Sequence, residues 1–325
     1  MRDFSYVRAG SRAEALDFGQ ADDAAFLAGG TELINWMRIG INAPARVIDL
    51  SRVEGLDAVE EIEGGVRIGA LARLNDVAQN PLIAEGYPVL SQAILRAASA
   101  QIRNLATIGG NPVQRVRCPY FRANEGAPCN KREPGSGCAA VPGIHDRHAI
   151  FGWTEDCVAV HPADPPVALA ALDAVIVTDH PEGGRRVPVR EFHVLPGQNP
   201  AWHDVLRAGE LIVGIELPAP AQQSAYLKIR ERESYEYATV SAAAALEIEG
   251  GVIRRARVAL GSVAMRPWRL VAAEERLAGL APDAPEVDES LDAAFAEARP
   301  LQGTEWKVRL ARNAARRVIE LAAEA

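Results

Sequence analysis

The run Gln101-Ile-Arg-Asn-Leu-Ala-Thr-Ile-Gly-Gly-Asn111 combines a short apolar strand with a Gly-Gly turn. A second turn of this kind, Leu27-Ala-Gly-Gly-Thr-Glu-Leu33, lies near the N-terminus, between a strand-like segment and a helix-like one. Because glycine has no Cβ, backbone amides in such turns approach a phosphate closely, and successive amides that point into one concavity form an anion nest. The turn at Gly29 and Gly30, taken alone, is also explained by a plain strand-turn-helix connection. The pairing of the two turns favours a site for a phosphate-bearing ligand.

The overall composition excludes several classes of protein. With 325 residues, the chain is long enough for two or three domains with cores of their own. Apolar residues make up 48% and the net charge is −8, which argues against a general nucleic-acid binder with its basic surface. No apolar run approaches the roughly 20 residues of a membrane span, and Met1-Arg-Asp-Phe4 leads into structure without a signal sequence. We therefore expect a cytoplasmically made chain whose export would have to be arranged by a partner.

Short strands and helices alternate through the first two thirds of the chain. Ser11-Arg-Ala-Glu14 has the spacing of a capping box and predicts a helix to about Phe18. Asp164 stands before Pro165, which predicts an N-cap for a helix that runs to Leu172. The pattern lacks the strand-GxGxxG-helix unit of a Rossmann fold and predicts an α+β domain. The remaining strands are expected at 25–28, 47–50, 66–71, 174–177, 186–189 and 211–217, and the remaining helices at 31–38, 75–80 and 88–100.

A Pro-rich segment, Leu217-Pro-Ala-Pro-Ala-Gln-Gln-Ser224, marks the expected domain boundary. Beyond it, three strand-like runs are followed by three helical segments with apolar faces. The strands are expected at 225–230, 238–247 and 252–263, and the helices at 266–277, 287–298 and 305–323.

All four cysteines of the chain follow the turn at Gly109 and Gly110. They are Cys118, Cys129, Cys138 and Cys157. Their residue types fit two disulfides, a structural zinc ion or an iron-sulfur cluster. A chain of this length does not need disulfides for stability. The wide spacing includes none of the close cysteine pairs that zinc sites usually show, but spacing alone does not exclude zinc.

The local charge helps to distinguish these interpretations. Between Gln101 and Arg132, a single acidic residue, Glu125, stands against six basic ones: Arg103, Arg115, Arg117, Arg122, Lys131 and Arg132. A thiolate-ligated iron-sulfur centre is negatively charged, and positive charge around it stabilises it and raises its potential. A solvated basic loop that faces an acidic partner is the alternative.

The two Gly-Gly motifs, together with Arg46-Val-Ile-Asp-Leu-Ser51 and Tyr226-Leu-Lys-Ile-Arg230, resemble the flavin-binding subunit of the molybdenum hydroxylases, the family of xanthine dehydrogenase and carbon monoxide dehydrogenase. The resemblance covers nearly the whole chain. Around Arg117-Cys-Pro-Tyr-Phe121 and Cys129-Asn-Lys-Arg132, the cysteine segment is similar to the flavin subunits of bacterial periplasmic aldehyde oxidoreductases.

This resemblance implies a specific α+β architecture. Residues 1–220 are expected to form a two-subdomain FAD-binding domain of the vanillyl-alcohol-oxidase (PCMH) type, with residues 112–157 as a cysteine-rich [4Fe-4S] insert. Residues 221–325 are expected to form the small C-terminal domain of the family, a three-stranded antiparallel sheet with helices.

The resemblance also implies the ligands of each cofactor. In the family, an aspartate matching Asp164 lies against the flavin, the residue matching Ile212 packs on the flavin nucleotide, and a lysine matching Lys228 lies near the isoalloxazine. The implied [4Fe-4S] ligands are Cys118, Cys129, Cys138 and Cys157. The implied FAD-binding residues are Phe26, Leu27, Ala28, Gly29, Gly30, Thr31, Glu32, Leu33, Thr107, Ile108, Gly109, Gly110, Asn111, Asp164, Ile212 and Lys228.

The implied function is that of an electron-transfer subunit with no catalytic residue of its own. Electrons would arrive from a large molybdenum-cofactor subunit and a small [2Fe-2S] subunit, and FAD would pass them to an external acceptor. The expected assembly is a heterotrimer, exported folded to the periplasm under a signal on the small subunit, with a cytoplasmic complex as the alternative. Other interpretations are a flavin subunit of the xanthine dehydrogenase, CO dehydrogenase or hydroxybenzoyl-CoA reductase type, an independent flavin oxidase or cell-wall precursor reductase, and a non-redox assembly subunit.

Overall fold

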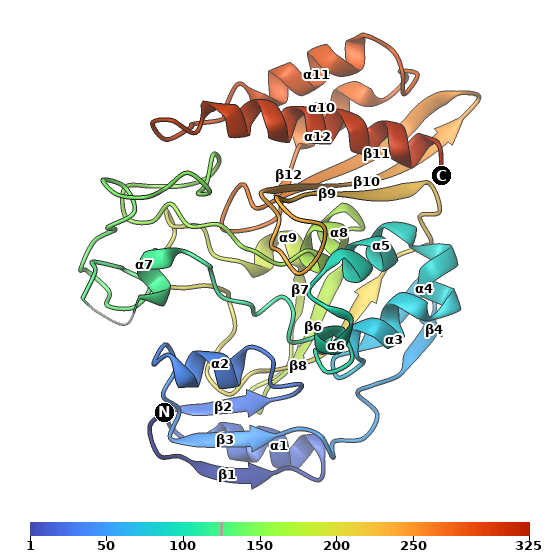
Figure 1. The fold of residues 1–325 in the computed structure, drawn as a ribbon. Helices are drawn as coiled ribbons and strands as arrows, with labels where there is room; N and C mark the ends of the chain where they lie inside the picture. Colours follow the sequence, from blue (N-terminus) through green and yellow to red (C-terminus); the bar gives the residue numbers. More distant parts are fainter. Residues whose placement is uncertain (124–125) are drawn as a thin grey trace.

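The structure, a computed structural model, describes residues 1–123 and 126–325. The described residues form three sheets stacked from the N-terminus to the C-terminus (Figure 1). A three-stranded sheet makes the N-terminal layer, a five-stranded sheet with its helices makes the middle layer, and a four-stranded sheet under three helices makes the C-terminal layer. Within the described part of the chain, no helix is long and apolar enough to cross a membrane.

The N-terminal layer is a parallel sheet in the order β1 (Ser5–Arg8), β3 (Arg46–Asp49), β2 (Ala24–Leu27). Its first helix is α1 (Arg12–Gly19), and the Ser11 hydroxyl accepts a hydrogen bond from the Glu14 amide, as the capping-box spacing predicts. The second helix, α2 (Leu33–Arg38), starts later than Thr31 and has only 6 residues. The loop 28–32 therefore joins β2 to α2 without regular structure.

The middle layer is an antiparallel sheet in the order β4-β5-β8-β6-β7. Its apolar face packs in one core with four of the helices: α3 (Leu74–Gln79), α4 (Pro81–Gly86), α5 (Pro88–Arg96) and α8 (Pro165–Ala171). Two short helices, α6 (Ala100–Arg103) and α9 (Val189–Phe192), complete it. The strands are β4 (Val59–Ile62), β5 (Gly65–Gly69), β6 (Val175–Asp179), β7 (Arg186–Pro188) and β8 (Leu211–Leu217). The strands expected at 174–177, 186–189 and 211–217 are therefore confirmed.

The insert 112–157 projects from one side of the middle layer (Figure 1). In its described residues, 112–123 and 126–157, it has one short helix, α7 (Pro119–Arg122), and is otherwise irregular. An isolated β-bridge between Cys129 and Cys138 ties its two halves together. Glu125, the acidic residue in the local charge count, lies outside the described residues.

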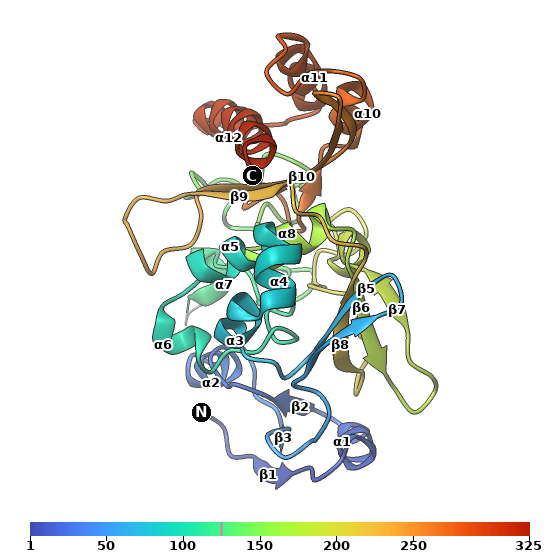
Figure 2. The ribbon, with the colours of Figure 1, turned by 90° about the vertical axis from the view of Figure 1, so that its right-hand side faces the viewer.

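The C-terminal layer confirms the three predicted strands as an antiparallel meander: β9 (Ser224–Ile229), β10 (Val240–Glu249) and β11 (Val252–Gly261). A fourth strand of two residues, β12 (Trp268–Arg269), pairs with β11 at the edge. The helices α10 (Val271–Leu277), α11 (Glu286–Phe295) and α12 (Glu305–Ala323) cover one face of this sheet, and α5 and α8 of the middle layer lie on the other side (Figure 2). The sheet is therefore buried on both faces.

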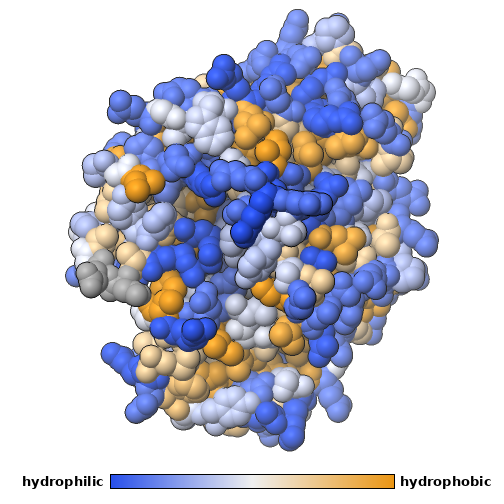
Figure 3. Space-filling model, in the orientation of Figure 1, coloured by the Kyte–Doolittle hydropathy of each residue, from blue (hydrophilic) through white to orange (hydrophobic). Residues whose placement is uncertain are grey.

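The surface is mixed in character. Figure 3 shows that hydrophobic residues gather over the N-terminal layer at the bottom of this face, while most of the remaining face is hydrophilic.

Candidate FAD site and cysteine site

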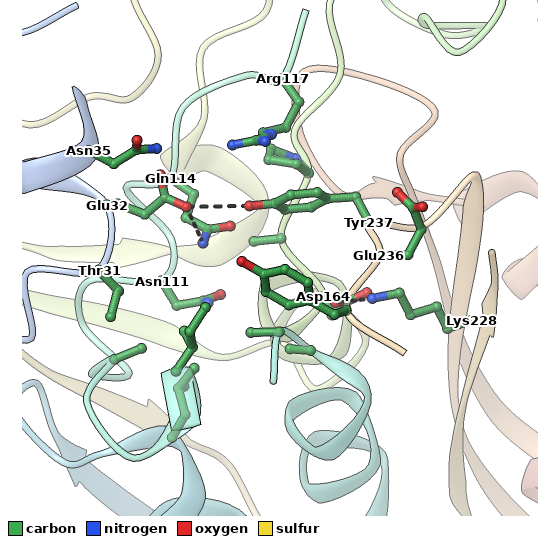
Figure 4. Close-up of a pocket in the computed structure, with 18 of the residues that line it drawn as sticks. Thr31, Glu32, Asn35, Asn111, Gln114, Arg117, Asp164, Lys228, Glu236 and Tyr237 are labelled. Atoms are coloured by element: carbon green, nitrogen blue, oxygen red, sulfur yellow. Dashed lines mark hydrogen bonds and ion pairs between the residues drawn. The ribbon is translucent and has the colours of Figure 1, made fainter. Parts of the chain in front are cut away.

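Two adjoining cavities lie between the N-terminal and middle layers and the loop 230–239, which joins β9 to β10. The nest cavity, of about 240 Å³, is lined by both Gly-Gly loops. The larger cavity, of about 290 Å³, continues from it to β9 and the loop 230–239 (Figure 4). The two cavities adjoin, because they share five lining residues: Thr31, Glu32, Ala106, Asn111 and Gln114.

The glycines at the nest cavity are needed for different reasons. A Cβ on Gly29 would lie 1.9 Å from the carbonyl oxygen of Leu105, because the two loops meet there backbone to backbone. Gly30 has a φ of +72°, in the left-handed region that other residues adopt at a cost. A Cβ on Gly110 would lie 3.1 Å from the Thr107 hydroxyl oxygen, a tight but local contact. Packing therefore fixes Gly29, and backbone conformation fixes Gly30.

The structure brings most of the predicted FAD residues to these cavities. Asp164 and Lys228 line the larger cavity. The nest cavity is lined by Phe26, Ala28, Gly29, Gly30, Thr31, Glu32, Leu33, Thr107, Gly110 and Asn111.

Four predicted residues line neither cavity: Leu27, Ile108, Gly109 and Ile212. Ile108 is fully buried in the core of the middle layer, and Ile212 of β8 belongs to the same core. A Cβ on Gly109 would meet Ala70 at 2.7 Å, so this glycine allows the second loop to pack on the middle layer. These residues support the loops from behind.

Asp164 is buried at the wall of the larger cavity, where β9 supplies both of its partners. Tyr226 donates its hydroxyl to Asp164 Oδ1 at 2.5 Å, and Lys228 Nζ donates to Oδ2 at 2.8 Å. Lys228 Nζ also donates to the Arg96 carbonyl at 3.0 Å. Burial raises the pKa of the Asp164 carboxyl, and the ammonium group of Lys228 opposes that shift.

One expectation from the sequence is corrected here. The Asp164 side chain makes no capping hydrogen bond to α8, because both of its oxygens face β9 instead. The side chain of Lys228 is only 1% exposed, so it is a buried ion-pair partner of Asp164.

A second cluster of polar side chains, Glu32, Gln114 and Tyr237, lies at the boundary between the two cavities. Glu32 Oε1 accepts hydrogen bonds from Gln114 Nε2 at 3.2 Å and from the Tyr237 hydroxyl at 3.4 Å (Figure 4). The Arg117 guanidinium lies 4.6 Å from the centre of the Tyr237 ring. Burial raises the pKa of Glu32, while the positive charges of Arg117 and Arg122 oppose this. Sequence reasoning missed Gln114 and Tyr237 because their roles depend on contacts distant in the chain.

The four cysteines come together around one small cavity of about 10 Å³ in the insert, and all four are free thiols. The disulfide interpretation is therefore not what the structure shows. Burial raises the pKa of Cys118 to about 11 and also raises that of Cys157, so these thiols stay protonated unless a positive charge is added. In residues 1–123 and 126–325, no three His, Cys, Asp or Glu side chains are grouped to hold a single metal ion.

The cysteine site adjoins the larger cavity along the chain. Arg117 lines the larger cavity, and the next residue, Cys118, lines the cysteine site. The start of the insert is held by two buried histidines, since ring nitrogens of His161 and His193 lie 3.2 Å and 2.8 Å from the Pro112 carbonyl oxygen. His161 therefore has a structural contact with the backbone at the start of the insert.

Comparison with known proteins identifies the family. Residues 2–220 match the FAD binding domain in molybdopterin dehydrogenase, and residues 225–322 match the CO dehydrogenase flavoprotein C-terminal domain. The chain is 43% identical over 317 residues to the aldehyde oxidoreductase FAD-binding subunit PaoB of Escherichia coli (strain K12), covering 96% of each chain. This chain belongs to the FAD-binding subunits of the molybdenum hydroxylases.

More distant relatives of this FAD-binding subunit include the glyceraldehyde dehydrogenase medium chain of Sulfolobus acidocaldarius, 29% identical over 279 residues that cover 85% of this chain and 82% of the relative. The solved carbon monoxide dehydrogenase from Hydrogenophaga pseudoflava superposes with a TM-score of 0.75 at 28% identity, over 99% of this chain and 97% of that one. The solved quinoline 2-oxidoreductase from Pseudomonas putida 86 gives 0.76 at 25% identity, over 99% and 97%. The predicted fold class is thereby confirmed.

Proposed function

We propose that this FAD-binding subunit is the FAD- and [4Fe-4S]-containing electron-transfer subunit of a molybdenum-dependent aldehyde oxidoreductase. It would receive electrons from the molybdenum and [2Fe-2S] subunits and deliver them through FAD to an external acceptor. The observation that supports this best is the pair of adjoining cavities, one lined by both Gly-Gly loops and the other by the buried pair of Asp164 and Lys228, beside a four-cysteine site. The 43% identity to an aldehyde oxidoreductase subunit favours aldehydes as substrates of the whole enzyme.

The residues that line the two adjoining cavities fit a dinucleotide. In this proposal the amides of the loops 27–33 and 107–111 bind the pyrophosphate. Asp164 and Lys228 contact the part of the ligand in the larger cavity, and Leu27, Ile108, Gly109 and Ile212 hold the loops and wall in place. FAD, when bound, supplies the redox chemistry, and the protein supplies binding, orientation and local charge. The division into domains 1–220 and 221–325 is part of the proposal, supported by the family matches on either side of residues 221–224.

The four cysteines fit a [4Fe-4S] cluster by their chemistry, since that cluster takes four thiolates. In such a cluster each thiolate would bind a different iron, so the four sulfurs would be spaced more widely than four ligands of one ion. Among the described residues, no group of side chains is arranged to hold a single metal ion, and this is compatible with a cluster. The present cavity is about 10 Å³, so the surrounding loops would have to part to admit one. Lys131, between the cysteines in sequence, would offset part of the thiolate charge.

The proposed assembly is a heterotrimer with a large molybdenum-cofactor subunit and a small [2Fe-2S] subunit. It is supported by the relatives, which are described as medium chains or FAD-binding subunits and so belong to larger enzymes. A periplasmic location, reached by export of the folded complex, accompanies the aldehyde oxidoreductase assignment, and a cytoplasmic complex is the alternative.

The composition of the purified protein tests this proposal. The chain should be expressed with its proposed partners, purified through a tag on this subunit, and analysed for FAD, iron, acid-labile sulfide, zinc and copurifying polypeptides. We expect one FAD per chain, both partners, and more iron and sulfide than the [2Fe-2S] subunit accounts for. Zinc at one per chain, with no iron and sulfide beyond those of the [2Fe-2S] subunit, would overturn the cluster assignment and leave the flavin assignment intact. A colourless chain without extractable FAD would support a non-redox assembly subunit instead.

A further inference from the structure

Tyr226 of β9 is buried and points its hydroxyl at Asp164, a carboxylate in the wall of the larger cavity. It is 1% exposed, and its hydroxyl donates to Asp164 Oδ1 at 2.5 Å. Asp164 lines the cavity, whereas Tyr226 lies behind it and does not. Any effect of Tyr226 on a ligand in this cavity therefore passes through Asp164.

The backbone of Tyr226 is fixed from the opposite side by α5. Its amide donates to Gln92 Oε1 at 2.9 Å, and its carbonyl accepts from Arg96 Nη1 at 2.5 Å. Pairing of β9 with β10 adds the ladder contact to Ala243. The ring is enclosed in the core of the middle layer, so the hydroxyl has little freedom to leave Asp164.

Lys228 alone does not hold the carboxylate in one orientation. It donates to Oδ2 only, from a flexible side chain whose ammonium is shared with the Arg96 carbonyl. A carboxylate that is held at one oxygen can turn about its terminal bond, whereas one held at both oxygens cannot. An ionised carboxylate accepts about four hydrogen bonds, so Asp164 retains capacity for a donor in the cavity after Tyr226 and Lys228 are satisfied.

We propose that Tyr226 is a positioning residue that holds the Asp164 carboxylate so that it accepts a hydrogen bond from an N–H or O–H group of the bound flavin nucleotide. This inference rests on the proposed function, because it takes FAD as the occupant of the cavity. It assigns a role to a residue that never touches the ligand.

The test compares FAD binding by Y226F with binding by a matched tyrosine variant. Tyr87 is also fully buried and donates its hydroxyl to the Pro218 carbonyl, away from both cavities, so Y87F removes an equivalent group without affecting Asp164. The protein, with any copurifying partners, is stripped of flavin and titrated with FAD while flavin fluorescence is followed. We expect the Kd for FAD to rise about tenfold in Y226F, as for loss of one hydrogen bond to a charged group, and to stay unchanged in Y87F.

A double-mutant cycle separates positioning from a general structural effect. Because Tyr226 acts through Asp164, Y226F should cause no further rise in the Kd for FAD in a D164N background. The variant D164E allows the same comparison where the loss of FAD affinity is smaller. Additive losses, or an unchanged Kd in Y226F, would overturn the inference. A wild-type protein that binds no FAD would instead overturn the proposed function, so the two failures are distinguishable.

Discussion

The first Gly-Gly turn contains two neighbouring residues with different tasks. Gly29 permits contact between two loops, whereas Gly30 has the positive φ that shapes the nest cavity. We expect G30V and G110V to lose bound FAD while the fold is kept, because the added side chains narrow the cavity and, at Gly30, the positive φ adds backbone strain. Extractable FAD per chain and the thermal unfolding temperature measure the two effects. Gly55, with a φ of +75° and open space around it, gives the control G55A.

The control should lose about 1 kcal/mol of stability and keep its FAD. G29A, by contrast, should lower the unfolding temperature strongly, since its Cβ has to displace the Leu105 backbone. Full FAD content in both G30V and G110V would contradict the nest assignment.

At the same scale, the limits of sequence reasoning are clear from Asp164. Resemblance placed Asp164 and Lys228 in the site, and the structure puts both at one cavity wall. The contact of Asp164 with Tyr226 spans 62 residues, and that of Glu32 with Tyr237 spans 205. Local pattern carries no information on such contacts, because they depend on how the layers stack.

Among the elements, α12 is fastened to the cysteine-rich insert by a buried lysine. Lys307 is 0% exposed, and its Nζ donates to the carbonyls of Arg147 and His148 at 2.9 Å and 2.7 Å. Burial lowers the pKa of Lys307 to about 7. The unfolded chain keeps this proton up to a pH of about 10, so between pH 7 and 10 unfolding takes up a proton and stability rises with pH.

We expect K307M to remove this increase, which amounts to at most about 1.4 kcal/mol per pH unit. Urea unfolding at several values between pH 7 and 9 measures the slope of the unfolding free energy. R309M, an exposed change in the same helix, should leave the slope as in wild type. Equal slopes in wild type and K307M would show that Lys307 does not titrate in this way.

The cysteine segment should bind its metal centre independently of the flavin loops. Cys138 and Cys157 line the cysteine site and neither FAD cavity, so C138S and C157S should lose iron and acid-labile sulfide while FAD stays bound. E133Q, an exposed change in the same segment, should keep both cofactors. Undiminished iron and sulfide in both cysteine variants would refute the ligand assignment. Joint loss of FAD and iron would instead mean that the centre is needed to hold the flavin loops.

Element boundaries were predicted less well than element types. The helix expected over 88–100 ends at Arg96, because the chain becomes extended at Ala97 and Ala98 has a φ of +47°. The helix expected from Arg266 starts only at Val271, since Trp268 and Arg269 pair with β11. In the second case, pairing with a distant strand overrides a local helical preference.

In the molecule as a whole, the candidate FAD cavities and the cysteine site occur on one chain. The layered fold and both Gly-Gly loops were predictable because strand pattern and turn chemistry are local. The contribution of the loop 230–239 to the wall of the larger cavity was not, because that loop comes from the C-terminal layer. In the proposed function, this chain would pass on electrons that another subunit supplies.

Anaerobic addition of an aldehyde, with the visible flavin absorbance followed over time, tests this account most directly. The complex copurified with its partners should show bleaching of the flavin band, and the isolated subunit reconstituted with FAD should show none. Full bleaching in the isolated subunit would contradict an electron-transfer role and indicate an independent flavin enzyme. A flavin band unchanged by any aldehyde in the intact complex would contradict the aldehyde oxidoreductase assignment.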